Sequence, residues 1–120
     1  EHAMSAFHQE LPHGAGLIML SVAYFTHLIN TGVYPDRFVT LAKALGHAEA
    51  VNPHDFIKAL VELQRACGVD SLKMSDYGIT EGELQQLAHK AREAGAAAFE
   101  QDAVALTFED TLAIYRAAFK

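Results

Sequence analysis

Hydrophobic positions recur along this chain at helical spacing. The segment from about His13 to Asn30 is apolar on nearly every side. A helix of that kind is typical of the centre of a bundle, so we expect it to be buried. Shorter stripes of hydrophobic residues, three or four positions apart, predict amphipathic helices that are half buried. These stripes are Phe38-Leu41-Ala42-Leu45, Phe56-Leu60-Leu63-Cys67 and Phe108-Leu112-Tyr115-Phe119.

Glycine and capping residues set the expected ends of these helices. Glu1 to Phe7 is expected to form the last turns of a helix that begins upstream, and His8 to Pro12 a loop. Glycines stand where three helices should end, at Gly32, Gly46 and Gly68. Proline is favoured in the first helical turn, which predicts helix starts at Pro35 and at Asn52-Pro53.

Two pairs of residues have the spacing of a capping box. In this motif, a Thr side chain and an acidic side chain three residues later each accept a hydrogen bond from the other's backbone N–H. They are Thr80 with Glu83 and Thr107 with Asp110. They predict the last two helices. Irregular links are expected before the first of these, at Val69–Gly78, and between the two, at Ala96–Leu106.

No segment alternates as a strand does, and no repeat or long linker divides the chain. The sequence therefore predicts one all-α domain over residues 1–120, a helical bundle of about five to six helices.

Composition limits the classes of function. The 120 residues are 51% hydrophobic, which is enough for a core, and 15 acidic residues outnumber 9 basic ones. A net charge of −6 without a basic cluster argues against nucleic acid as a partner. The longest apolar run, Ala15 to Phe25, is well short of the ~20 residues that cross a bilayer, so we expect no membrane span. The single cysteine, Cys67, is expected to be a small buried hydrophobe in a cytoplasmic protein.

Candidate chemistry gathers near the start of the chain, where His2, His8, Glu10 and His13 lie within twelve residues. Imidazole and carboxylate are ligands of zinc, ferrous iron and related ions. His13 follows Pro12 at the start of a long helix, where the helix dipole disfavours protonation and so favours a neutral, ligating imidazole. The flanking Gly14 and Gly16 would let a nucleotide or substrate approach the backbone.

The same residues have a simpler interpretation, in which His8 and Glu10 belong to a solvated loop and His13 only caps a helix. The other histidines are expected to be structural or on the surface. They are His27, on an apolar helix, and His47, His54 and His89.

A longer stretch carries a family resemblance. Residues 2–20, His-Ala-Met-Ser-Ala-Phe-His-Gln-Glu-Leu-Pro-His-Gly-Ala-Gly-Leu-Ile-Met-Leu, resemble the metal-site segment of the iron-containing (group III) alcohol dehydrogenases, in the dehydroquinate synthase-like superfamily. Residues 37–46, the turn Asp76-Tyr77-Gly78-Ile79 and the last helix from Thr107 also resemble that family, so the similarity covers essentially the whole chain.

The resemblance implies a C-terminal, all-helical, metal-binding domain of an NAD(P)-dependent enzyme that interconverts alcohols and aldehydes. His2 and His13 would be two of four ligands to a divalent ion, Fe²⁺ first and Zn²⁺ second. The other two ligands, an Asp and a His, and the nucleotide-binding domain would lie upstream as a partner in the same chain. We therefore expect the fragment alone to be inactive.

One departure concerns proton transfer. Relatives often carry another histidine four residues after the first ligand, where this chain has Ala6. His8 is the residue that could take over the relay of protons.

Two other functions stay open at this point. Glycerol dehydrogenases and dehydroquinate synthases share the scaffold, and the missing upstream ligands would distinguish them. A non-catalytic helical interaction module, in which the histidines are incidental, is the alternative from another class. Association into a homo-oligomer is also open.

Overall fold

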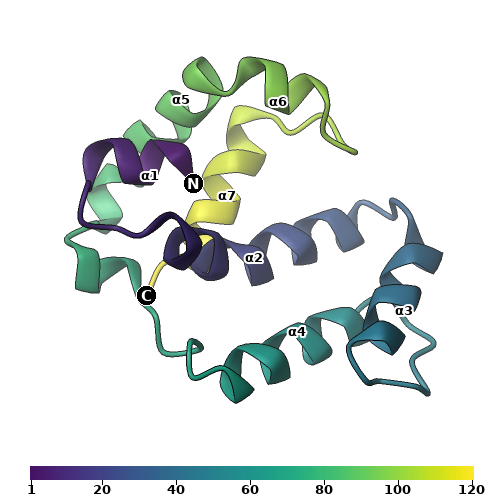
Figure 1. Cartoon of the computed structure of the whole chain (residues 1–120). Coiled ribbons are helices and arrows are strands. Elements are labelled where there is room, and N and C mark those ends of the chain that lie inside the picture. Colours follow the sequence, from purple (N-terminus) through teal and green to yellow (C-terminus); the bar gives the residue numbers. More distant parts are fainter. The chain divides into compact units, whose positions relative to one another are not determined.

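The computed structural model describes the backbone of residues 1–120 and every side chain except that of Ala98. The fold is all-helical, as predicted, and no strand forms within these described residues. Figure 1 shows the helices in chain order. They are α1 (His2–Phe7), α2 (His13–Asn30), α3 (Pro35–Ala44), α4 (Asp55–Ala66), the 3₁₀ helices η1 (Met74–Tyr77) and η2 (Glu81–Glu83), α5 (Leu84–Ala94), α6 (Ala96–Glu100) and α7 (Phe108–Ala118).

The contacts divide the chain into two compact units, with the boundary inside α2. The first, here called the terminal unit, consists of residues 1–23 and 72–120. The second, the central unit, consists of residues 24–71. Each has its own packing and is described by itself.

In the terminal unit, α5 packs against both α1 and α7 (Figure 1). The core between them contains side chains that are almost fully excluded from water, namely Met4, Met74, Ile79, Leu84 and Leu87. Burial of apolar area of this kind is the main stabilising contribution to the folded state. This core fixes α1, and with it the start of the chain, against the last helices.

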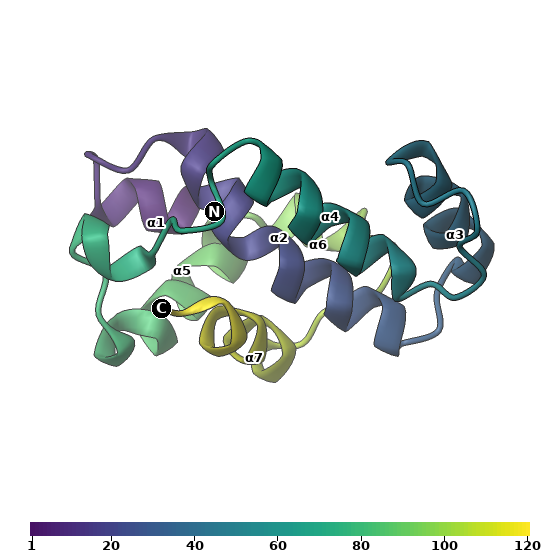
Figure 2. The ribbon, with the colours of Figure 1, turned by 90° about the horizontal axis from the view of Figure 1, so that it is seen from below.

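The central unit is organised around three phenylalanines. α3 packs against α4, and Phe38 and Phe56 from these helices meet Phe25 of α2. The ring of Phe25 is edge-on to both, with centroids 6.3 Å from Phe38 and 5.2 Å from Phe56. Edge-to-face packing is a favourable geometry for aromatic rings. Figure 2 shows α4 beside the C-terminal end of α2.

Both predicted capping boxes are confirmed. A Glu83 oxygen accepts hydrogen bonds from the backbone N–H and the hydroxyl of Thr80, each at 2.8 Å. Asp110 accepts in the same way from Thr107, and its own N–H donates to the Thr107 hydroxyl at 3.1 Å. The first box opens η2, which continues into α5, and the second opens α7.

The expectation that α2 is buried all round is wrong. Within the terminal unit, its residues Met19, Leu20 and Ala23 are partly buried against the core, whereas Leu17, on another side, is 50% exposed. Because one side packs and another does not, the helix is half buried despite its uniformly apolar sequence. No helix in the described part of the chain is long and apolar enough to cross a membrane.

The stripe on α4 also differs from the prediction. Cys67 is exposed and Leu63 is 44% exposed, so only the first half of the stripe, at Phe56, lies in the core. The helix begins at Asp55, two residues after the expected start at Pro53. The reason is that the Asn52 side chain accepts a hydrogen bond from the His54 N–H at 2.9 Å, which forms a separate turn before the helix.

The two links expected to be irregular each contain a short helix. η1 lies in the first link and α6 in the second. Helices of four or five residues are too short to show a hydrophobic period, so the sequence pattern does not reveal them.

Candidate metal centre

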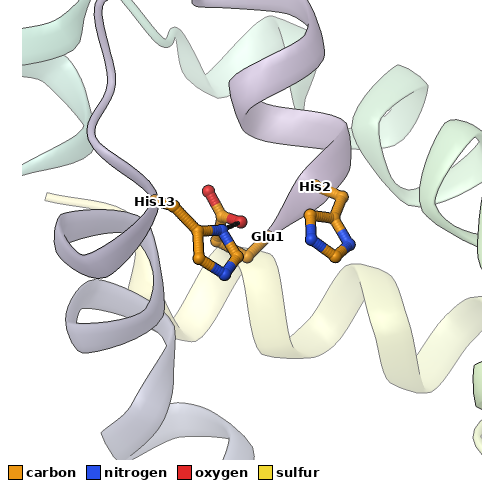
Figure 3. A group of neighbouring side chains, drawn as sticks. All are labelled: Glu1, His2 and His13. Carbon is orange, nitrogen blue, oxygen red and sulfur yellow. Dashed lines mark ion pairs between the residues drawn. The ribbon is translucent and has the colours of Figure 1, made fainter.

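Three potential metal ligands meet where α1 and α2 begin. Glu1 is the N-cap of α1, His2 is its first residue, and His13 is the first residue of α2 (Figure 3). The turn between the helices reverses the chain and brings both starts together. One ligand atom from each of Glu1, His2 and His13 lies within 4.8 Å of the others. This spacing allows the three groups to share an ion.

The two imidazoles lie face to face. The rings of His2 and His13 are nearly parallel, at 8°, and their centroids are 5.0 Å apart. His2 is exposed, and the side chain of His13 is 53% exposed. Both rings are therefore accessible to an ion and to groups arriving from outside this chain.

The carboxylate of Glu1, in contrast, is buried, with only 4% of the side chain exposed. Its Oε2 forms an ion pair with Nδ1 of His13, drawn as a dashed line in Figure 3. Its Oε1 accepts a hydrogen bond from the hydroxyl of Ser5. Apart from the ion pair, Oε2 has no hydrogen-bond donor among the described residues. A buried carboxylate with so few donors favours a nearby cation.

Gly16, one turn into α2, leaves the space that this carboxylate occupies. A Cβ at Gly16 would lie 2.7 Å from both Cγ and Oε1 of Glu1, closer than such atoms approach. Gly16 was expected to let a nucleotide or substrate approach the backbone, but the side chain of Glu1 lies there instead. Gly14 has no neighbour within 4 Å of such a Cβ, so its backbone is open.

A further ionisable group, Tyr115 of α7, is affected by the charge of Glu1. Burial raises the pKa of Tyr115 to about 12, and the negative charge of Glu1 adds to the effect. Tyr115 therefore remains a neutral phenol at physiological pH.

The structure does not bring His8 or Glu10 into the group. The Nε2 of His8 lies 3.2 Å from Oε1 of Glu83, and the His8 side chain is 16% exposed. The pKa of Glu83 is lowered, first by the hydroxyl of Thr80, then by its N–H, and to a smaller extent by His8. Glu10 is exposed. The role of His8 as a proton relay stays a prediction.

Glu1 is the member of the group that sequence reasoning missed. Two signals were present in the sequence. The carboxylate directly precedes His2, and a glycine follows His13 by three residues, on the same side of the helix. Neither signal shows that Glu1 is buried, because that depends on how α1 packs.

The remaining histidines pair in other ways. His47 lies 2.8 Å from Glu62, and His54 lies 3.1 Å from the side-chain oxygen of Asn30. His89 is exposed and its ring stacks on Phe108, with centroids 4.2 Å apart. Within the described side chains, no second group of three ligands forms.

The donor set of two imidazoles and one carboxylate suits a divalent ion of intermediate softness, such as Fe²⁺ or Zn²⁺. Three residues alone do not complete a four-ligand site. The exposed side of the two rings leaves room for further ligands.

Comparison with known proteins gives one family. The family model described as "Fe-containing alcohol dehydrogenase family, C-terminal" matches residues 1–119. The chain has no significant match among the curated proteins or among the solved structures.

Proposed function

Because the chain belongs to the Fe-containing alcohol dehydrogenase family, as a C-terminal domain, we propose that His2 and His13 are ligands to the catalytic divalent ion of an NAD(P)-dependent alcohol dehydrogenase. The observation that carries this proposal is the convergence of His2, His13 and the buried Glu1 at the starts of two helices.

The position of His13 supports a ligand role. It is the first residue of an 18-residue helix, and 53% of its side chain is exposed, so an ion can reach the ring. The close contact of its Nδ1 with Oε2 of Glu1 restricts the orientation of the ring.

Once bound, the divalent ion would act as a Lewis acid on the oxygen of the alcohol or carbonyl substrate while hydride passes between substrate carbon and nicotinamide. The residues of this chain hold one side of that site. The exposed faces of His2 and His13 leave room for the substrate oxygen and for ligands from elsewhere.

We propose that an N-terminal domain of the same polypeptide supplies the cofactor-binding site and the remaining metal ligands. By similarity to the family, that domain would bind NAD(P) and contribute an Asp and a His to the ion. The donor set fits Fe²⁺ and also Zn²⁺. His8 would reach the reacting oxygen as a proton relay only after its contact with Glu83 is broken.

The ligand assignment is tested by His13→Ala in the full-length enzyme. We expect at least a 10-fold loss of turnover and a metal content well below one per chain, because one of the ligands is removed. Elemental analysis measures the metal and an NAD(P)H absorbance assay the turnover. His2→Ala should behave in the same way.

The matched control is His47→Ala, which removes an imidazole that pairs with Glu62 and is not a member of the three-ligand group. It should keep both metal and activity near the wild-type values. A His13→Ala enzyme with the metal content of the wild type would refute the ligand assignment.

A further inference from the structure

One side chain ties the turn between α1 and α2 to a distant part of the terminal unit. His8 is the C-cap of α1, and its Nε2 lies 3.2 Å from Oε1 of Glu83, 75 residues further along the chain. We infer that His8 is a positioning residue: its hydrogen bond to Glu83 holds the turn, and so keeps His2 and His13 close enough to share an ion. This inference rests on the proposed function of these two histidines as ligands.

The hydrogen bond between His8 and Glu83 has a defined direction. The pKa of Glu83 is lowered, mainly by the hydroxyl of Thr80, so the carboxylate is ionised at neutral pH. An ionised carboxylate only accepts hydrogen bonds, and Nε2 of His8 is therefore the donor. Hydrogen bonds to an ionised acceptor are stronger than those between neutral groups. A single contact of this kind can restrain a turn.

Both partners of this hydrogen bond are held in place. The His8 side chain is 16% exposed and lies over the link between η1 and η2, where a Cβ on Gly78 would be 3.7 Å from its Nδ1. Oε2 of Glu83 accepts from the N–H and the hydroxyl of Thr80, which leaves Oε1 for His8. The capping box of Thr80 thus also fixes the acceptor for the turn.

Backbone hydrogen bonds connect His8 with the two helices that carry the ligands. Its N–H donates to the Met4 carbonyl of α1 at 2.8 Å, and its carbonyl accepts from the Leu11 N–H at 3.0 Å. Met4 is fully buried in the core of the terminal unit, and Leu11 is 3% exposed in the same core. His8 therefore lies between the helix that begins with His2 and the residue two positions before His13.

Ligands that are held in place before the ion arrives lose less conformational freedom when it binds. Without the contact to Glu83, the turn keeps the burial of Leu11 but loses its polar attachment, so His2 and His13 should sample more positions. A hydrogen bond to a charged group contributes at least about tenfold to an equilibrium constant. Because only part of this reaches the ligands, we expect metal binding to weaken by about 3- to 10-fold when the contact is lost.

The test uses full-length enzyme, with Zn²⁺ as the probe and a chromophoric chelator as competitor. His8→Ala should bind Zn²⁺ about 3- to 10-fold more weakly than the wild type. His8→Gln should restore most of the affinity, because the amide nitrogen of Gln extends about as far as Nε2 of His and also donates to Glu83. A His8→Gln enzyme that binds as weakly as His8→Ala would overturn the positioning role.

The partner residue needs its own control, because Glu83 also belongs to a capping box. Glu83→Ala removes both the contact to His8 and the box of Thr80. Asp110→Ala removes the equivalent box of Thr107 in the same unit and leaves the His8 contact unchanged. We expect Glu83→Ala to weaken Zn²⁺ binding as His8→Ala does, and Asp110→Ala to bind as the wild type does.

The double variant His8→Ala/Glu83→Ala should bind Zn²⁺ no more weakly than either single variant, because each alone already removes the contact. Fully additive losses, or an equal loss in Asp110→Ala, would contradict the inference.

A second readout does not depend on bound metal. In the metal-free enzyme, the Leu11 N–H, which donates to the His8 carbonyl, should exchange its hydrogen faster in His8→Ala and Glu83→Ala than in the wild type. Its exchange should be unchanged in His8→Gln and Asp110→Ala. Wild-type exchange in all four variants would show that the contact does not hold the turn.

The outcomes separate the two proposals. If His13→Ala loses metal while His8→Ala and Glu83→Ala bind Zn²⁺ as tightly as the wild type, the positioning role is wrong and the ligand assignment stands. If His13→Ala itself keeps the metal, both are wrong.

Discussion

At the scale of single residues, Asp55 shows how a carboxylate can order a turn and a helix start together. Its Oδ2 accepts from the backbone N–H groups of Val51 and Asn52, at 3.2 and 3.0 Å. Its Oδ1 accepts from the Lys58 ammonium at 2.8 Å. These bonds stabilise the ionised form, with that to Lys58 as the largest cause, and lower the pKa of Asp55 to about 2.

The lowered pKa predicts how stability depends on pH. A carboxylate with a folded pKa below its unfolded value of about 3.9 contributes fully above the unfolded value. That contribution should be lost as pH falls from about 4 toward 2. We expect Asp55→Asn to be less stable than the wild type at pH 7 and the difference to shrink on acidification, as measured by urea unfolding. A difference that is constant from pH 7 to pH 2 would contradict this.

At the scale of elements, the segment that joins η1 to η2 depends on one backbone conformation. Gly78 ends η1 with a φ of +80°, and its N–H donates to the Ser75 carbonyl at 3.1 Å. Two residues later, Thr80 begins the capping box that leads into α5. The turn at Gly78 therefore directs the chain from one capped helix end to the next.

Replacing Gly78 should destabilise the fold through its backbone. A Cβ there would lie 3.7 Å from Nδ1 of His8, an ordinary contact, so the cost comes from the left-handed conformation. We expect Gly78→Ala to lower the free energy of unfolding by about 1–2 kcal/mol. Thermal and urea denaturation measure it.

Gly82, four residues on, is the matched control. It has no positive φ, and a Cβ there would have the Thr80 hydroxyl as its nearest neighbour, at 4.0 Å. Gly82→Ala should change stability by less than about 0.5 kcal/mol. Equal losses in both variants would show that the left-handed turn is not the cause.

At the scale of the whole molecule, the chain contains two separate sets of buried side chains. Leu87, 1% exposed, belongs to the core of the terminal unit. Phe56, 6% exposed, belongs to the phenylalanine cluster of the central unit. Each core is built from its own helices, so a cavity in one should act first on the elements that line it.

Hydrogen exchange can test this. Leu87→Ala should cost about 2–5 kcal/mol and reduce protection mainly in α1, α5 and α7. Phe56→Ala should cost about 3–5 kcal/mol and reduce protection mainly in α3 and α4. If both variants reduced protection equally in all helices, the two cores would form a single cooperative unit.

The sequence predicted the fold class, the bounds of α2 and both capping boxes, because periodicity and capping chemistry are local. It could not predict that α2 is only half buried, because an apolar side chain does not show whether anything packs on it. Similarly, residue type and the family resemblance predicted that His2 and His13 are candidate metal ligands. The burial of Glu1 could not be predicted, because it depends on which side chains surround the starts of α1 and α2 in the folded chain.

The contact between Glu1 and Gly16 also limits which residue of α2 can face the carboxylate. Beside Gly16 stand Ala15 and Leu17, both of which carry a Cβ. If α2 shifted by one residue relative to α1, a side chain would meet the carboxylate where now there is none. The glycine is thus the position at the start of α2 that accepts the carboxylate in the arrangement where His2 lies beside His13.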